Sequence, residues 1–307
     1  MSERQTALDF MRLRTAAFAL SALLIVVAIG AFALRGLNLG LDYTGGTLLE
    51  VGFGAPVALD EVRGTLAEVG FPRASVVHFG SDNEVLIRLP SADSASAVQR
   101  IVDGLAARNE AGVTLRRTEL VGPQMGDEMS GQGLLAVMAS FLMVMLYVSM
   151  RFQWKLSVGA VAALVHDVVI TLGAFALFGW EIDLAVLAAF LALIGYSIND
   201  TIVVYDRIRE NVRKMRRTDL SSIANASLNQ TLGRTLMTSG VTLLSVIALL
   251  LFGGETLRGF SLALTIGIVI GTYSSIYIAT STALAMGLDR ADLMLPTPEQ
   301  GEAQETP

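Results

Sequence analysis

The chain has 307 residues, and only 16% of them are charged, against about 25% in an average soluble domain. Hydrophobic residues make up 53%, and the mean hydropathy of +0.58 excludes an ordinary soluble domain and indicates a membrane protein. The chain has no cysteine, which excludes a disulfide framework and thiol chemistry. The net charge of −6 combines an acidic loop with a locally basic segment, so it does not indicate a nucleic-acid partner.

Six charge-poor runs are long enough to cross a bilayer, which takes about 20 apolar residues. After a cytoplasmic tail of residues 1–14, we expect the first transmembrane helix at 15–35 and five more within 129–288. The first run exceeds the apolar core of a cleavable signal, which has about 7–15 residues, so we interpret it as a retained span. The runs are 15–34, 129–150, 156–180, 184–205, 235–254 and 259–288.

In the tails and the short connections, lysine and arginine residues lie almost entirely on one side of the predicted spans; the long loop after the first span is not counted, because long loops translocate largely regardless of charge. The N-terminal tail, the turn after the second span, the segment between the fourth and fifth spans and the C-terminal tail hold thirteen of them, whereas the two opposite turns hold only Arg258. This asymmetry predicts cytoplasmic termini and an extracytoplasmic loop after the first span. The basic stretch 206–227 is typical of a cytoplasmic segment that contacts lipid headgroups or a partner subunit.

The long loop, residues 36–128, alternates between strand-like and helix-like patterns and predicts a separate extracytoplasmic domain. The order β-α-β-β-α-β is that of a ferredoxin-like domain. The expected fold class is therefore an α-helical polytopic membrane protein with an α+β domain after its first span. We interpret the domain as a binding module, because its lone His78 fits an ordinary strand position. Strands are expected at 47–53, 74–79, 84–89 and 113–121, and helices at 59–70 and 94–108.

Asp200 is the only charged residue in the run 184–205. An ionised carboxylate at such depth costs about 2.5 kcal/mol or more, so it marks a functional site. Tyr196 and Ser197 precede it by four and three residues on the same helix face, and Asn199 and Thr201 flank it. We expect this polar face to point into the helix bundle rather than at lipid.

Four motifs in this order resemble those of the SecF family. The stretch 41–50, LDYTGGTLLE, is similar to the glycine-rich signature that opens the extracytoplasmic domain of SecF proteins. The stretch 195–211, GYSINDTIVVYDRIREN, resembles the fourth-span motif of the same family, and 163–171 and 229–240 are supporting matches. Besides Asp200, the signature residues in the first two motifs are Asp42, Gly45, Gly46, Asp206 and Arg207.

The resemblance implies a partner-dependent function in the bacterial inner membrane. SecF pairs with SecD, a related six-span protein, in an assembly of the RND exporter type that uses the proton-motive force in late steps of protein export through SecYEG. The resemblance also implies unfolded exported polypeptides as substrate, YajC and YidC as further partners, and protons as the coupling ion with no other cofactor. We expect that the protein is not an enzyme, because the sequence has no nucleotide-binding loop, metal cluster or nucleophile triad.

Asp200 and Arg234 form the centre of a predicted proton switch. If the fifth span's helix begins near Leu228, Arg234 enters the membrane about two turns in and reaches Asp200. Burial raises a carboxylate's pKa and a nearby guanidinium lowers it, so relative movement of the two groups would drive proton uptake and release. A structural ion pair that only joins two helices is the alternative. A polar stripe supports the site and consists of Thr235, Thr238, Thr242 and Ser245.

Asp167 is the second candidate in the proton relay, because the stretch 163–171 resembles the third-span motif of the family. His166 and Asp167 are adjacent, so we expect them to point about 100° apart and not to face one site. The alternative for Asp167 is a structural hydrogen bond or helix packing.

The remaining candidates are structural. Gly267 and Gly271 form a small-xxx-small pair that predicts close helix packing, against this bundle or against SecD. Gly45 and Gly46 predict a tight turn, with substrate contact as the alternative. Arg207 is expected to be an interfacial anchor, with a second contact to Asp200 as the alternative. The tail 289–307 is acidic and proline-rich and predicts disorder.

Two alternative functions are half of an RND-type proton-coupled exporter of small molecules or lipids and a passive membrane-anchored scaffold. The extracytoplasmic turns at 179–183 and 253–258 are only a few residues long, which argues against a substrate-capture vestibule. A passive scaffold would need a single span and no intramembrane carboxylate.

Overall fold

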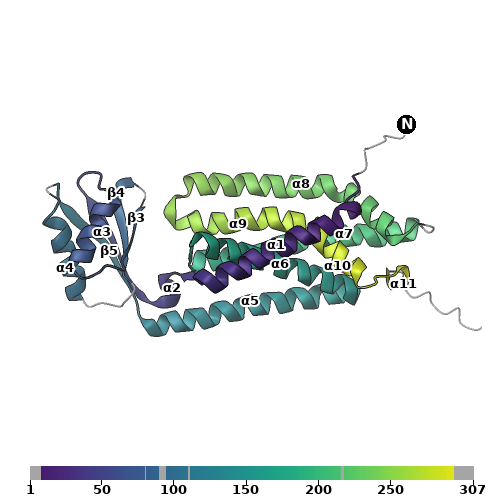
Figure 1. Ribbon diagram of the computed structural model, residues 1–307, viewed down its shortest axis with the longest axis horizontal. Coiled ribbons are helices and arrows are strands. Elements are labelled where there is room, and N and C mark those ends of the chain that lie inside the picture. The colour runs from purple at the N-terminus through teal and green to yellow at the C-terminus, as the bar shows by residue number, and fades with distance from the viewer. Residues whose placement is uncertain (1–7, 80, 90–94, 110, 216–217, 294–307) are drawn as a thin grey trace, which may run out of the picture.

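The computed structural model describes residues 8–79, 81–89, 95–109, 111–215 and 218–293. Within these residues, six helices are long and apolar enough to cross a membrane, and they run side by side with the α+β domain at one end (Figure 1). The fold class predicted from the sequence is confirmed. The spans are α1 (Arg14–Arg35), α5 (Pro123–Arg151), α6 (Trp154–Phe178), α7 (Leu184–Lys214), α8 (Leu220–Phe252) and a last span made of α9 (Gly254–Ser274), a π-helical turn (Ser275–Ala279) and α10 (Thr280–Ala285).

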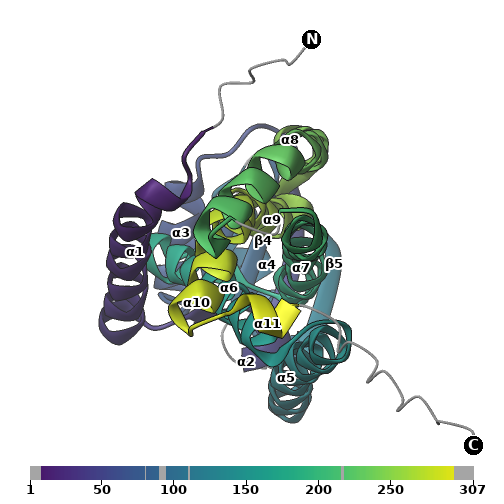
Figure 2. The ribbon, with the colours of Figure 1, turned by 90° about the vertical axis from the view of Figure 1, so that its right-hand side faces the viewer.

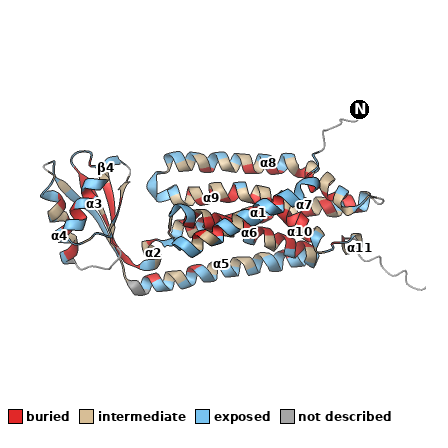
Figure 3. Cartoon of the chain, in the orientation of Figure 1, coloured by how far each residue is buried: buried red, intermediate tan, exposed pale blue. Residues whose placement is uncertain are grey.

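Helices α6, α7 and α9 form the centre of the bundle. Within the most apolar stretch of each helix, 56% of α6 and 50% of α7 is buried. The corresponding buried shares of α5 and α8 are only 11% and 17%. Figure 2 shows α1, α5 and α8 around the rim, and Figure 3 shows that α5 and α8 are largely exposed along their length. Their outward side chains are apolar, so these faces suit lipid or another membrane-spanning chain. Examples are Leu135, Met143 and Leu244.

The α+β domain, which the sequence predicts to be extracytoplasmic, consists of an antiparallel sheet with two helices on one face. The sheet order is β3-β4-β2-β5, which places the first and third strands of the unit at the centre, as in ferredoxin-like domains. Alternate side chains of β2 and β4 point towards the helices and form the core, among them Leu49, Val51, Val85 and Ile87. The elements are β2 (Gly46–Phe53), α3 (Leu59–Glu68), β3 (Ser75–Phe79), β4 (Ser81–Leu89), α4 (Ala95–Ala106) and β5 (Val113–Val121).

Two spans extend beyond their apolar runs. Helix α5 begins at Pro123, six residues before the predicted start at 129, because proline suits a first helical turn, where its missing N–H is not needed. Helix α8 begins at Leu220 and not near Leu228, because the Asp219 side chain accepts a hydrogen bond from Ser222 N at 2.9 Å and caps it. Caps rather than hydropathy set these boundaries, so most of the basic segment 206–227 is helical.

The predicted disorder of the tail from Asp289 is wrong for its first residues, which include a short helix, α11 (Arg290–Leu293). Carbonyls at the end of α7 and in the connection that follows it lack helical partners, and the Arg290 guanidinium donates to three of them. Lys155 at the start of α6 binds Asp292 at 2.7 Å. Residues 294–307 lie outside the described part of the chain. The carbonyls that accept hydrogen bonds from the Arg290 guanidinium belong to Val212, Met215 and Thr218, and the nitrogen–oxygen distances are 2.6, 2.6 and 3.1 Å.

Candidate functional site

Two carboxylates are buried between the helices of the bundle. Asp167 on α6 is 0% exposed and Asp200 on α7 is 4% exposed. Among the described residues, no three His, Cys, Asp or Glu side chains gather as a metal site would require. Asp200 accepts a hydrogen bond from a hydroxyl group, whereas Asp167 is held by hydroxyl groups and by an imidazole.

Asp200 lies where α7, α8 and α9 meet. Ser239 of α8 donates a hydrogen bond to Asp200 Oδ2 over 3.4 Å, and Thr272 of α9 donates to Ser239 over 2.8 Å. A donor–acceptor distance of 3.4 Å exceeds the usual range for O–H···O bonds, so the bond is weak. The carboxylate thus points inward, as expected from the sequence, and is only loosely held.

The side chains predicted to surround Asp200 point in different directions. Ser197 donates to Asp167 instead, and Thr201 donates to the Ser197 carbonyl at 3.5 Å. The Tyr196 hydroxyl is buried and has no hydrogen-bond partner within the described chain, whereas Asn199 is exposed. Successive residues of a helix point about 100° apart, so these side chains cannot all surround one carboxylate.

Arg234 does not form the predicted ion pair with Asp200. Its charge is close enough to act on Asp200, but its side chain is exposed and no ion pair of the described residues joins the two groups. At about 1.5 Å per residue, Asp200 lies roughly 25 Å from the start of α7 and Arg234 roughly 25 Å from the end of α8, which is the same end of the bundle, so they differ in direction and not in depth. Thr238 donates to the carbonyls of Arg234 and Thr235 within α8, at 3.1 and 3.0 Å.

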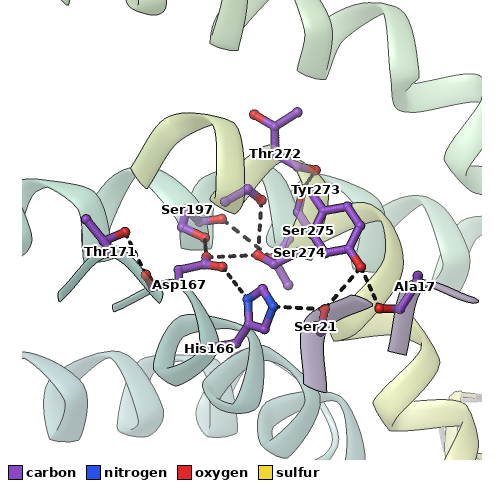
Figure 4. Close-up of polar contacts among 12 residues, drawn as sticks. Ala17, Ser21, His166, Asp167, Thr171, Ser197, Thr272, Tyr273, Ser274 and Ser275 are labelled. Atoms are coloured by element: carbon purple, nitrogen blue, oxygen red, sulfur yellow. Dashed lines mark hydrogen bonds and ion pairs between the residues drawn. The ribbon is translucent and has the colours of Figure 1, made fainter. Parts of the chain in front are cut away.

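Asp167 is the centre of a denser network (Figure 4). Ser197 of α7 and Ser274 of α9 donate to its Oδ2 atom over 2.6 and 2.8 Å. Thr171 donates to the Asp167 carbonyl over 2.7 Å. Ser274 directly precedes the π-helical turn of the last span, and such turns are frequent at functional sites. Three helices therefore converge on this carboxylate.

The expectation that His166 and Asp167 point apart is wrong. Their Nδ1 and Oδ1 atoms are 2.9 Å apart, because rotation of both side chains offsets the angle between their Cα–Cβ bonds. On its other side, His166 Nε2 lies 3.0 Å from Ser21 Oγ of α1. Ser21 lies 3.0 Å from the Tyr273 hydroxyl, which donates to the Ala17 carbonyl over 2.7 Å (Figure 4). The chain of bonds joins α6 to α1 and α9.

The direction of the bonds along this chain assigns a hydrogen to His166 Nε2. Because Tyr273 donates to Ala17, Ser21 donates to Tyr273, and His166 Nε2–H donates to Ser21. On the other side of the ring, one hydrogen lies between His166 Nδ1 and Asp167 Oδ1.

Gly267 and Gly271 let α9 pack closely on α7. A Cβ atom at Gly267 would lie 2.5 Å from Leu193 Cδ2, and one at Gly271 would lie 3.2 Å from Ser197 Oγ. The predicted packing device therefore acts within this bundle. It brings Ser197 and Ser274 to Asp167 from two helices.

The signature residues at the ends of the spans take structural positions. Asp206 binds Arg151 at 2.9 Å, and Arg207 binds Glu210 at 2.9 Å, so the structure does not bring Arg207 to Asp200. Gly45 and Gly46 have φ values of +69° and +142° and form the expected turn, between α2 (Leu41–Thr44) and β2.

Several residues that contact the two carboxylates or their partners were not predicted from the sequence. The signal for Ser21 is that it is the only hydroxyl-bearing residue between Thr15 and Arg35. Ser239 directly follows Thr238 on a helix rich in hydroxyl groups, so only the rotation of α8 reveals which one faces inward. The residues missed are Ser21, Ser239, Thr272, Tyr273 and Ser274.

The fold and the buried carboxylates define a polytopic membrane protein with a ferredoxin-like domain at one end of its helix bundle and two carboxylates enclosed between its helices. Residues 102–289 match the family described as "Protein export membrane protein SecD/SecF, C-terminal", and residues 30–57 match the SecD/SecF GG motif. The chain therefore belongs to the SecD/SecF family, and its curated relatives place it among the SecF members.

Those relatives match over nearly their whole length. The protein translocase subunit SecF of Vibrio alginolyticus is 47% identical over 303 residues, which cover 98% of this chain and 96% of the relative. The SecF subunit of Pseudomonas aeruginosa is 46% identical over 295 residues, with 94% of each chain covered. Both are named as transport subunits and not as enzymes.

A solved structure shows the same architecture. The crystal structure of SecDF, a translocon-associated membrane protein from Thermus thermophilus, superposes with a TM-score of 0.84 at 37% identity over 94% of this chain. A SecDF structure in a super-membrane-facing form gives a TM-score of 0.71 over the same share. The chain spans 40% of the length of either SecDF chain.

Proposed function

We propose that this chain is the SecF half of a proton-driven accessory complex of the Sec protein translocase, in the bacterial inner membrane. The observation that carries the proposal is the pair of buried carboxylates, Asp167 and Asp200, inside a bundle whose relatives are SecF translocase subunits. The chain matches only 40% of a SecDF chain, which supports a SecD-type partner for the remainder. In this proposal, the complex acts on unfolded exported polypeptides in late steps of export through SecYEG, with YajC and YidC as further partners.

The proposed coupling step is proton binding at Asp200. The loosely held carboxylate binds a proton when Arg234 is turned away and releases it when the guanidinium approaches. Each proton that crosses supplies ~2.3 kcal/mol per 100 mV, enough to bias a two-state element that differs by a few kcal/mol. The exposed side chains of Asn199 and Arg234 at mid-bundle support a partner surface here, because polar groups at this depth are expensive against lipid.

Asp167 is the second proton carrier in this proposal. Its pair with His166 holds one transferable proton, and Ser197 links the pair to the helix that carries Asp200. Movement of α7 therefore changes the hydrogen bonds of both carboxylates. The network consists of neutral donors, so the proton can move between Oδ1 and Nδ1 without leaving an uncompensated charge.

The experiment is export in vesicles that contain the translocase and the complete accessory complex, with and without a proton gradient. Asp200→Asn keeps the side chain's shape but removes its titration, and we expect loss of the gradient-dependent part of export. Asp206→Asn on the same helix is the matched control, because Asp206 is exposed at the boundary and binds Arg151. Gradient-dependent export by Asp200→Asn at the unaltered rate would refute the proposal.

The exporter of small molecules or lipids is the second candidate. Helix α8 ends at Phe252 and α9 begins at Gly254, and α6 and α7 are joined by residues 179–183. These short connections provide no second extracytoplasmic domain around a ligand. The structure thus favours the export function over this alternative.

A further inference from the structure

The glycine-rich segment after α1 holds the N-terminus of α7. Asp42 Oδ2 accepts a hydrogen bond from Leu184 N at 2.9 Å, and Asp183 Oδ1 accepts one from Val186 N at 2.8 Å. Two carboxylates therefore cap the same helix, where free N–H groups and the helix dipole favour negative charge. Asp183 is the ordinary cap of its own helix, whereas Asp42 comes from a segment 142 residues away in sequence.

Backbone pairing strengthens the same contact. Strand β1 (Asn38–Leu39) pairs in parallel with β6 (Glu181–Ile182), and Gly40 N donates to the Ile182 carbonyl at 2.8 Å. The Asn38 side chain donates to the Gly179 carbonyl at 3.0 Å. We call this contact, between residues 38–46 and residues 179–184, the joint.

The sheet of the domain takes part in the joint directly. Arg88 of β4 forms an ion pair with Glu181, and both side chains are about 30% exposed, at 27% and 29%. Arg88 lies opposite Leu48 of β2, in the register that leaves both on the face away from α3 and α4. The domain thus touches the α6–α7 turn through a side chain as well as through its linker.

The two sides of the joint are closely packed. A Cβ atom at Gly40 would lie 2.8 Å from Glu181 Oε1, at the end of a side chain, and 3.2 Å from the Ile182 carbonyl oxygen, a backbone atom. The segment 38–46 is also closely packed on its neighbours outside the joint, because a Cβ atom at Gly126 of α5 would lie 2.7 Å from the Tyr43 carbonyl and one at Gly46 would lie 2.2 Å from the Leu89 carbonyl.

We infer that the joint makes the extracytoplasmic domain and α7 one mechanical body, so that displacement of α7 at Asp200 moves the domain. This inference rests on the proposed function, because Asp200 is its proton site. The chain itself connects the domain only to α1 and α5. The joint adds a third, noncovalent connection, to the helix that carries the buried carboxylate, and this assigns a physical role to Asp42 and Arg88.

The absence of native cysteine allows a direct test by cross-linking. Leu39 and Ile182 are partners in the parallel pair β1–β6, and neighbouring strands lie about 4.8 Å apart, within the range that a disulfide spans. We expect Leu39→Cys/Ile182→Cys in the complete complex to export at the same rate whether oxidised or reduced, because the joint stays closed throughout the cycle. Loss of export on oxidation that reductant restores would show that the joint opens, and would overturn the inference.

The second test weakens the joint and includes a readout that does not depend on export. For Asp42→Ala/Arg88→Ala we expect hydrogen exchange at the first-turn amides of α7 to rise about fivefold, as loss of one helix cap produces, together with loss of gradient-dependent export. Asp60→Ala is the matched control, since its carboxylate is exposed on α3 and binds only Arg63. Faster exchange with unaltered export would overturn the inference, as would unaltered exchange.

The outcomes separate this inference from the proposed function. If Asp200→Asn leaves export unaltered, the proposed function fails, whatever the exchange data show. If Asp200→Asn abolishes the gradient-dependent export while Asp42→Ala/Arg88→Ala does not, the proton site stands and the joint fails.

Discussion

Replacement of Gly173 by alanine should push α1 away from α6. The new Cβ atom would lie 2.2 Å from Ala28 Cβ and 2.7 Å from Ala28 Cα. Carbon atoms that are not bonded pack best at about 3.5–4.0 Å, so α1 must retreat by more than about 1 Å. Neither group has a flexible end that could turn aside.

The retreat of α1 affects the buried network as well as packing. Ser21 lies two helical turns before Ala28 on the same face, and it is bonded to His166 at 3.0 Å. Overpacking costs about 1–3 kcal/mol, and an unsatisfied buried polar group costs about 1–3 kcal/mol. The expected loss for Gly173→Ala is therefore about 2–6 kcal/mol of the free energy of unfolding.

The assay is equilibrium unfolding of the purified chain in a mild detergent. Gly30→Ala is the matched control on α1, because a Cβ atom there meets nothing within 4 Å. Ala28→Gly in the Gly173→Ala background removes the nearer colliding atom and should restore part of the lost stability, because the contact with the Cα atom of residue 28 at 2.7 Å remains. The reasoning fails if Gly173→Ala unfolds like the unaltered chain, or if Ala28→Gly gives no rescue.

Two further predictions concern groups outside the membrane. Burial, with the charges of Asp42 and Asp183, raises the pKa of Tyr43 to about 12. The folded state thus favours the protonated phenol, so this stabilisation is complete below the ordinary pKa of about 10 and is lost as the pH rises towards 12; the phenolate absorbance of the unaltered chain and of Tyr43→Phe checks it. The hydrogen bond from Lys155 holds the pKa of Asp292 below its usual value, so the attachment of the tail should be complete above about pH 4 and weaken below it. Asp292→Asn should abolish that dependence in hydrogen exchange at residues 289–293, and an unchanged profile would contradict the assignment.

The order of elements was predictable because hydropathy and periodicity determine it. The run 113–121 predicted β5 at its observed bounds, since Gly112 and Gly122 mark its two ends in the sequence. Helix ends were less predictable, because Asp219 and Pro123 extend α8 and α5 by local bonding outside the apolar runs. The tail helix could not be foreseen, since it depends on carbonyls of a different helix.

The site was predictable in its carboxylates and not in their partners. An acidic residue in an apolar run can be recognised from the sequence alone, as Asp200 can. The partner of a carboxylate depends on the rotation of neighbouring helices, so Ser239 faces Asp200 where Arg234 was expected. His166 and Asp167 illustrate the same limit, because side-chain rotation joined two groups whose backbone directions diverge.

The π-helical turn at Ser275–Ala279 has a consequence for how the chain tolerates deletions. Such a turn accommodates one residue more than an α-helix of the same height. Deleting that residue would return the turn to an α-helix and leave the residues beyond it facing as they do now. A deletion within the α-helical part, α9, would instead rotate them by about 100° and turn Ala279 and Ala283 away from Gly159, whose Cβ position lies 2.5 and 3.3 Å from them. The π-helical turn is therefore the place in the last span where loss of one residue should disturb the packing least.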